Sequence, residues 1–189
     1  DAYQSRGLGD VYKRQPDTGR DTLITTTNLK TYFTSENSDE PIKAVDDVSL
    51  SIQRGEVLGL VGESGSGKST FGRSLLRLTP ITDGNVSFDG IDVGGLDRNA
   101  LKALRRRMQM IFQDPYASLN PRMTVYDTLA EPLLLHKIVD RTGLDAAIRE
   151  LMDNVGLARG FAKKYPHEFS GGQRQRIAIG RALATKPEF

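Results

Sequence analysis

The chain has 189 residues, which is enough for one domain with a buried core. Hydrophobic residues make up 38% and charged residues 26%, an ordinary composition for a globular protein. The net charge of +2 is too small to argue for a nucleic-acid partner, and the lack of cysteine excludes disulfides and thiolate metal sites. The longest apolar runs, such as residues 57–61, are too short to cross a bilayer.

The first 15 residues do not share the pattern of the rest of the chain. No methionine precedes Met108, and the N-terminus lacks the apolar segment of a secretory signal. We expect residues 1–15 to be a non-native or disordered leader.

Three segments in the first third of the chain predict β-strands. Residues 23–30 are rich in Thr and Ile, and residues 48–52 alternate apolar and polar side chains, which indicates a half-buried strand. The polar stretch 34–41 between them predicts a loop. Residues 57–61 are continuously apolar, which is typical of a strand covered on both faces of a parallel sheet.

A loop rich in glycine and serine follows residues 57–61 and fits the Walker A pattern G-x-x-x-x-G-K-[ST]. Its glycines allow backbone conformations that let successive N–H groups surround phosphate oxygens at the start of a helix. Lys68 would reach the β- and γ-phosphates, and the Ser69 hydroxyl would reach Mg²⁺. The pattern predicts nucleotide binding but leaves open GTPases, kinases and motors. The predicted binding residues are Gly62, Glu63, Ser64, Gly65, Ser66, Gly67, Lys68, Ser69 and Thr70.

Apolar side chains recur with helical spacing after this loop. Phe71, Leu75 and Leu78 stand at i, i+4 and i+7, which predicts an amphipathic helix. Two Asp-Gly pairs bracket a short predicted strand at 86–88. A further helix is predicted around 101–108.

The character of the sequence changes after an apolar run at 110–112. Strand signals disappear beyond residue 115, and helical periods are centred on 124–136 and 144–155. This pattern predicts a helical insertion.

A Ser-Gly-Gly-Gln segment opens the last predicted helix. Ser170 and Gln173 have the spacing of a capping box, in which each side chain bonds the other residue's backbone N–H. Gly171 and Gly172 are costly in the first turn of a helix. Their presence favours a close approach of the backbone to an anion at the helix N-terminus.

Several motifs together resemble one family. FSGGQ at 169–173 resembles the signature motif of ATP-binding cassette (ABC) proteins. MIFQDPYASLNPR at 110–122 is similar to the Q-loop of oligopeptide and dipeptide importer ATPases. YPHE at 165–168, VGES at 61–64 and EPL at 131–133 match the same peptide and nickel importer branch.

The resemblance implies an α/β P-loop NTPase fold with an antiparallel β subdomain and an α-helical insertion. An ABC ATP-binding domain would span 22–189, with its core at 22–114 and 176–189 and a helical subdomain at about 115–175. No Walker B motif occurs between the signature motif and the last residue, so we expect the domain in this chain to be C-terminally incomplete. We expect it to hydrolyse ATP poorly by itself although its parent does so.

The resemblance also implies roles for single residues. Tyr32 would stack on adenine, with Phe33 as the alternative. Gln113 would coordinate Mg²⁺ or position the attacking water, and it would act with Lys68 in catalysis. The signature residues that would contact the nucleotide of a partner subunit are Ser170, Gly171, Gly172 and, at the ribose, Gln173.

The implied parent is the ATP-binding subunit of a bacterial importer for peptides or related solutes. Its implied partners are a second ABC ATPase subunit and integral-membrane permease subunits, with no nucleic acid. It would lie peripherally on the cytoplasmic face of the inner membrane and touch that membrane only through the permeases. Two alternatives stay open, namely a non-catalytic nucleotide-binding fragment and a soluble ABC ATPase of translation or repair.

Overall fold

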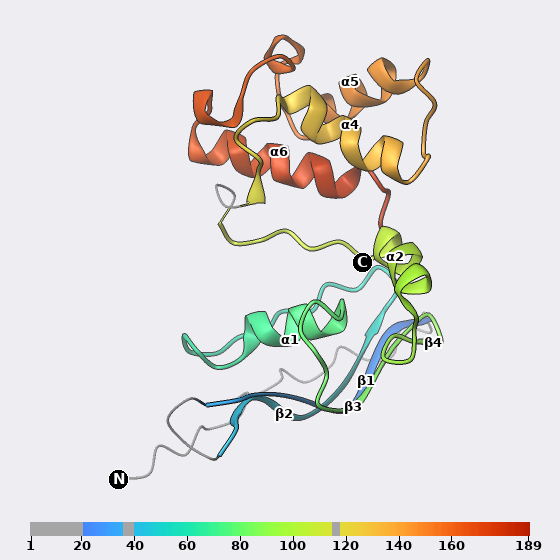
Figure 1. The fold of residues 1–189 in the computed structure, drawn as a ribbon, viewed down its shortest axis with the longest axis vertical. Helices are drawn as coiled ribbons and strands as arrows, with labels where there is room; N and C mark the ends of the chain where they lie inside the picture. The colour runs from blue at the N-terminus through green and yellow to red at the C-terminus, as the bar shows by residue number, and fades with distance from the viewer. Residues whose placement is uncertain (1–20, 36–39, 115–117) are drawn as a thin grey trace. The chain divides into compact units, whose positions relative to one another are not determined.

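The computed structural model describes three stretches of the chain, residues 21–35, 40–114 and 118–189. The leader expected at 1–15 lies outside the described residues, as does part of the expected loop at 34–41. Figure 1 colours the described residues from blue to red along the chain.

The chain divides into two compact units, Asp1–Leu101 and Lys102–Phe189. The boundary falls inside helix α2 (Arg98–Arg107), which confirms the helix predicted around 101–108. No helix in the described ranges is long and apolar enough to span a membrane.

The described part of the first unit contains one antiparallel sheet of four strands in the order β2-β1-β3-β4 (Figure 1). The strands are β1 (Thr22–Phe33), β2 (Ile42–Gln53), β3 (Asp83–Phe88) and β4 (Ile91–Asp92). Ile24 is in register with Phe88, and both side chains are fully buried because alternate residues of neighbouring strands share one face. The strands predicted near 23–30, 48–52 and 86–88 are therefore confirmed.

Helix α1 (Lys68–Leu75) contacts β1 and β2 and follows directly after the glycine-rich loop. Its predicted apolar positions Phe71 and Leu75 are buried. Leu78 is 44% exposed and lies beyond the helix end, so the prediction that it belongs to the apolar face of this helix is wrong. The helix ends earlier because Arg77 adopts a left-handed backbone conformation with φ of 50°.

The strand predicted at 57–61 is not a strand in the structure. Val57 is 97% exposed, Val61 is 71% exposed, and no strand of the described sheet pairs with this segment. An apolar segment becomes a parallel strand only when neighbouring strands satisfy its backbone N–H and C=O groups. The prediction fails because apolar composition indicates fitness for burial and says nothing about whether such neighbours are present.

In the second unit, the end of α2 pairs with the last residues of the chain. The Phe189 N–H donates to the Arg107 carbonyl at 3.1 Å, and the Gln109 N–H donates to the Phe189 carbonyl at 2.8 Å. Two such bonds around one residue are the pattern of a parallel pair. The Arg107 guanidinium also donates to the Glu188 carboxylate at 2.9 Å.

Among the described residues of the second unit, three helices contribute to the apolar core, and Figure 1 shows them in yellow to red. They are α4 (Val125–Leu135), α5 (Leu144–Asn154) and α6 (Gly171–Leu183), with short 3₁₀ turns at Arg159–Phe161 and Pro166–Glu168. Leu129, Ile148 and Ile177, one from each helix, are buried in a single apolar cluster. A Cβ atom on Gly180 would stand 3.2 Å from Leu129, so this glycine lets α6 approach α4 closely.

Helix ends in the second unit lie where the sequence predicts them. Thr124 caps α4, its side chain accepting from the Asp127 N–H at 3.1 Å while the Asp127 carboxylate accepts from the Thr124 N–H. His136 ends α4, and Val155 ends α5. The division into a core at 22–114 and 176–189 and a helical subdomain at about 115–175 stays a prediction.

Candidate functional site

At two positions the loop before α1 adopts a backbone conformation that residues with a side chain rarely adopt. Gly65 and Gly67 have φ of 82° and 90°, in the left-handed region. A Cβ atom on Gly67 would stand 2.0 Å from the Ala44 carbonyl oxygen on β2, which is closer than real atoms come. The loop therefore passes directly against the sheet, and its shape depends on a residue without a side chain.

The N-terminus of α1 lies at the end of this loop. Its cap residue is Gly67, which supplies no side-chain oxygen to the N–H groups of the first turn, and residues 68–71 include no acidic side chain. The positive end of the helix thus carries no built-in carboxylate. This arrangement suits an anion that comes from outside the chain.

The Lys68 ammonium is held across the loop that precedes it. It donates to the carbonyl oxygens of Gly62 at 2.7 Å and Glu63 at 2.6 Å, and its nitrogen lies 3.2 Å from the Ser66 hydroxyl. The Ser66 N–H donates to the Glu63 carbonyl at 3.2 Å and tightens the turn. The loop therefore places one positive charge beside the N-terminus of α1. Ser69, one residue further, is exposed, so its hydroxyl can reach a ligand.

Tyr32 lies near this loop through the pairing of β1 with β2. It stands opposite Lys43 in the ladder, and the next residue, Ala44, is the one whose carbonyl touches the position of Gly67. Thr31 reaches α1 as well, because its hydroxyl bonds to that of Ser74 at 2.9 Å in a buried pair. The structure thus brings Tyr32 into the neighbourhood of the glycine-rich loop.

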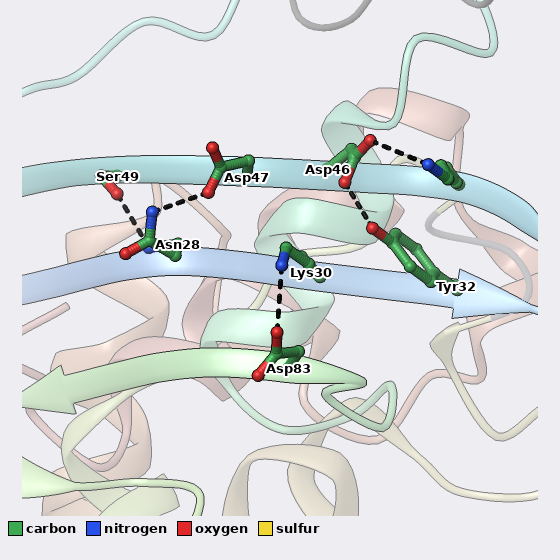
Figure 2. Close-up of polar contacts among 8 residues, drawn as sticks. Asn28, Lys30, Tyr32, Asp46, Asp47, Ser49 and Asp83 are labelled. Atoms are coloured by element: carbon green, nitrogen blue, oxygen red, sulfur yellow. Dashed lines mark hydrogen bonds and ion pairs between the residues drawn. The ribbon is translucent and has the colours of Figure 1, made fainter.

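The Tyr32 hydroxyl donates to the Asp46 carboxylate, as Figure 2 shows. This bond raises the pKa of Tyr32 and lowers the pKa of Asp46, so at neutral pH a protonated phenol meets an ionised carboxylate. The Lys43 ammonium lies 3.6 Å from Asp46 and 5.6 Å from the centre of the Tyr32 ring. Sequence reasoning missed Asp46 and Lys43, although the antiparallel pairing of β1 with β2 brings them close to Tyr32.

Gln113 and the Ser-Gly-Gly-Gln segment belong to the second unit. Gln113 is exposed in a bend after the apolar run at 110–112, which is itself not a strand. Ser170 caps α6, its N–H donating to the Gln173 side chain at 3.0 Å while its hydroxyl accepts from the Gln173 N–H at 3.4 Å. The predicted capping box is confirmed.

Gly171 and Gly172 have no visible structural reason to be glycine. Both have helical rather than left-handed backbones, and within the described part of the chain a Cβ added to either meets no atom within 4 Å apart from the nearby backbone of its own helix and its chain neighbours. Alanine would fit and would stabilise the helix. The free space above this first turn leaves room for another molecule to approach the backbone.

Comparisons with known proteins place this geometry in a family. The sequence model described as "ABC transporter" matches residues 45–189. OppF of Bacillus subtilis, an oligopeptide transport ATP-binding protein, is 54% identical over 169 residues, which cover 88% of this chain and 55% of OppF. The protein of the same name in Streptococcus mutans is 48% identical, over 90% of this chain and 55% of its own length. This chain therefore spans little more than half of these relatives.

Solved structures show the same fold. A dimeric structure of the ATP-binding cassette MJ0796, bound to ADP and Pi in a post-hydrolysis state, matches with a TM-score of 0.79 and 32% identity. That match covers 87% of this chain and 71% of the other. CbiO1 from Clostridium perfringens matches with a TM-score of 0.72 at 24% identity, covering 89% of this chain and 63% of cbiO1, which supports the fold alone.

Proposed function

The chain belongs to the ABC transporter family, and from that premise we propose that it is the ATP-binding part of a peptide importer. The observation that carries the proposal is the loop before α1. Gly67 is pressed against Ala44, Lys68 lies across the loop, and no acidic side chain occupies the first turn of the helix. These features suit the binding of a polyphosphate, and a turn that only connects two elements does not need them.

Each residue of the loop has a proposed task in binding ATP. Backbone N–H groups from Gly62 to Thr70 would donate to phosphate oxygens, and the Tyr32 ring would stack on adenine. The Lys68 ammonium would exchange the carbonyls of Gly62 and Glu63 for the β- and γ-phosphates. The exchange is feasible because an ammonium has three donors on a flexible stem.

The proposed metal is Mg²⁺, held by the Ser69 hydroxyl together with phosphate oxygens of the nucleotide. In the described residues no group of three His, Cys, Asp or Glu side chains could hold a metal ion alone. An exposed hydroxyl beside a phosphate site fits an ion that arrives with its nucleotide. When bound, Mg²⁺ would neutralise charge on the phosphates.

Gln113 is proposed to join Lys68 in catalysis. An amide side chain can hold a water molecule in line or contribute an oxygen to Mg²⁺. Its exposure in a bend supports this role, since the side chain is not committed to a core.

The second proposed partner is another copy of such a cassette. Ser170, Gly171, Gly172 and Gln173 would contact the nucleotide held by that copy. The free space at both glycines supports this assignment, and so does the dimer described for MJ0796. Permease subunits would complete the importer, and the protein would lie peripherally on the cytoplasmic face of the inner membrane. The names of the OppF relatives support peptides as the transported class.

Nucleotide binding is tested by titrating the purified chain with MgATP in a calorimeter. We expect saturable binding that Lys68→Ala weakens at least tenfold, because the loop then loses its charge at the phosphates. Lys163→Ala removes an exposed lysine from the second unit and serves as the control. Equal affinity of Lys68→Ala and the wild type would overturn the proposed site.

Peptide import is tested with a chimera in which residues 22–189 replace the matching segment of Bacillus subtilis OppF. Cells that carry only the chimera should take up a labelled oligopeptide, and cells with the Lys68→Ala chimera should not. If the chimera is made in normal amounts and uptake is absent, the proposed transport role is wrong.

A further inference from the structure

Three side chains on the first two strands form a cluster beside the glycine-rich loop. The Tyr32 hydroxyl donates to Asp46, the Lys43 ammonium lies 3.6 Å from Asp46, and the same ammonium lies 5.6 Å from the centre of the Tyr32 ring. We call these residues the Tyr32–Asp46–Lys43 cluster. Figure 2 shows Tyr32 on one strand turned toward Asp46 on the other.

Hydrogen bonds and a close packing contact hold the backbone of β1 and β2 in place around this cluster. The Tyr32 N–H donates to the Thr82 hydroxyl at 2.8 Å. Thr31 bonds to Ser74 of α1 in the buried interior, and Ala44 touches the position of Gly67. The cluster therefore keeps a defined position relative to the loop.

The contacts of the ring restrict how it can turn. A tyrosine at the surface can adopt several rotamers, and ordering such a side chain during binding costs affinity. A hydrogen bond to an ionised carboxylate is stronger than one between neutral groups. Asp46 thus holds the ring before any ligand arrives, and Lys43 lies over the ring.

The charge of Asp46 makes a second point. A carboxylate near a polyphosphate site weakens anion binding, so electrostatics alone would favour its removal. Lys43 offsets this charge in part. A carboxylate at this position is explained if it strengthens binding of the nucleotide base by more than it weakens binding of the phosphates.

We propose that Asp46 is a positioning residue for the nucleotide base, which it serves by holding the Tyr32 ring as a preorganised stacking surface. The inference rests on the proposed function, because it needs ATP to bind at the neighbouring loop. It assigns Asp46 a favourable effect on binding of the base and no favourable effect on binding of the phosphates.

The experiment compares two ligands, MgATP and inorganic tripolyphosphate, which has the phosphate chain and no base. Asp46→Ala should weaken MgATP binding about threefold to tenfold, the range expected for ordering one side chain. It should leave tripolyphosphate binding unchanged or slightly tighter. Tyr32→Phe keeps the ring and loses the hydroxyl, so it should match Asp46→Ala, and the double variant should bind no worse than either.

Two conservative variants separate positioning from charge. Asp46→Asn keeps an oxygen that can accept from Tyr32 and should bind MgATP within about twofold of the wild type. Asp47→Asn removes the same charge one residue along, where Asp47 accepts from the Asn28 amide at 2.7 Å, and should change nothing. Its left-handed backbone, with φ of 60°, is one that asparagine tolerates.

The outcomes are distinguishable. If Asp46→Ala binds MgATP as tightly as the wild type, or loses both ligands equally, the positioning role is overturned while Lys68-dependent binding still supports the proposed function. If the wild type binds neither ligand, the proposed function and this inference fall together. Thermal unfolding of each variant shows whether a loss of binding comes from a loss of folded protein, and a binding loss explained that way also counts against the positioning role.

Discussion

Gly67 ends the glycine-rich loop so close to Ala44 that a Cβ atom would stand 2.0 Å from the Ala44 carbonyl oxygen. The contact joins the loop to β2, and β2 carries Lys43 and Asp46 opposite Tyr32. The glycine-rich loop and the proposed base-stacking surface thus lie against the same strand, β2, in the first unit.

Gly67→Ala should distort the loop. The left-handed conformation alone costs an alanine about 1–2 kcal/mol, and the clash with Ala44 adds to it. Urea unfolding should show the loss of stability, and MgATP titration should show a loss of binding. Gly72→Ala, inside α1 with no described atom within 4 Å of the new Cβ, is the control and should gain about 0.5–1 kcal/mol. Equal stability of the two variants would contradict the role given to Gly67.

Ser170→Ala should destabilise α6. The variant loses the side chain that accepts from the Gln173 N–H, and loss of such a cap costs about 1 kcal/mol. Thermal or urea unfolding measures the change. Ser170→Asn, which keeps a capping oxygen, should stay close to the wild type, and a loss as large as that of Ser170→Ala would argue against capping.

Gly172→Ala should separate stability from assembly. The helix gains up to about 1 kcal/mol, because the site has open space and a helical backbone. Association of two copies in the presence of MgATP should fall, since the new methyl group stands where the partner's nucleotide is proposed to approach. Sedimentation with and without MgATP tests this. Undiminished association would contradict the proposed role of Gly172 between copies.

Thr31→Val should weaken the attachment of α1 to the sheet. The buried Thr31 and Ser74 hydroxyls bond at 2.9 Å, and removal of one partner of a buried pair costs about 1–3 kcal/mol. Ser74 still donates to the Thr70 carbonyl at 2.9 Å, which favours the lower end of that range. Urea unfolding measures the loss. Thr31→Ser keeps the hydroxyl and should lose less, so the reverse order would count against this hydrogen bond.

The Lys30–Asp83 ion pair, 3.0 Å between its charged atoms, predicts a pH dependence (Figure 2). The hydrogen bond to Lys30 lowers the pKa of Asp83, and the same bond raises the pKa of Lys30. The stabilisation is therefore present between the usual values of 3.8 and 10.5. It is lost as pH falls through the lowered pKa of Asp83 or rises through the raised pKa of Lys30.

The comparison of Asp83→Asn with the wild type measures this effect. The variant should be less stable at pH 7, and the difference should shrink below the usual pKa of aspartate and in high salt, which screens exposed pairs. A difference that is the same at pH 7 and pH 2.5 would show that the pair does not act through charge.

Local signals in the sequence determine much of this protein. The capping boxes that begin at Thr124 and Ser170 define where α4 and α6 start, because both partners of a cap lie within four residues. Alternating side chains predict the strand at 48–52, and the Thr and Ile content predicts the strand at 23–30. The spacing of glycine and lysine predicts the loop at 62–70. In each case neighbouring residues in the chain supply the interaction.

Only the tertiary structure decides the features that need distant partners. Residues 57–61 are apolar enough for a strand and yet are not one, since no described strand satisfies their backbone groups. The bond from Tyr32 to Asp46 depends on the register of β1 and β2, which shifts irregularly on both sides of Thr31. Composition does not encode such shifts, because they come from backbone bulges that form only when two strands meet.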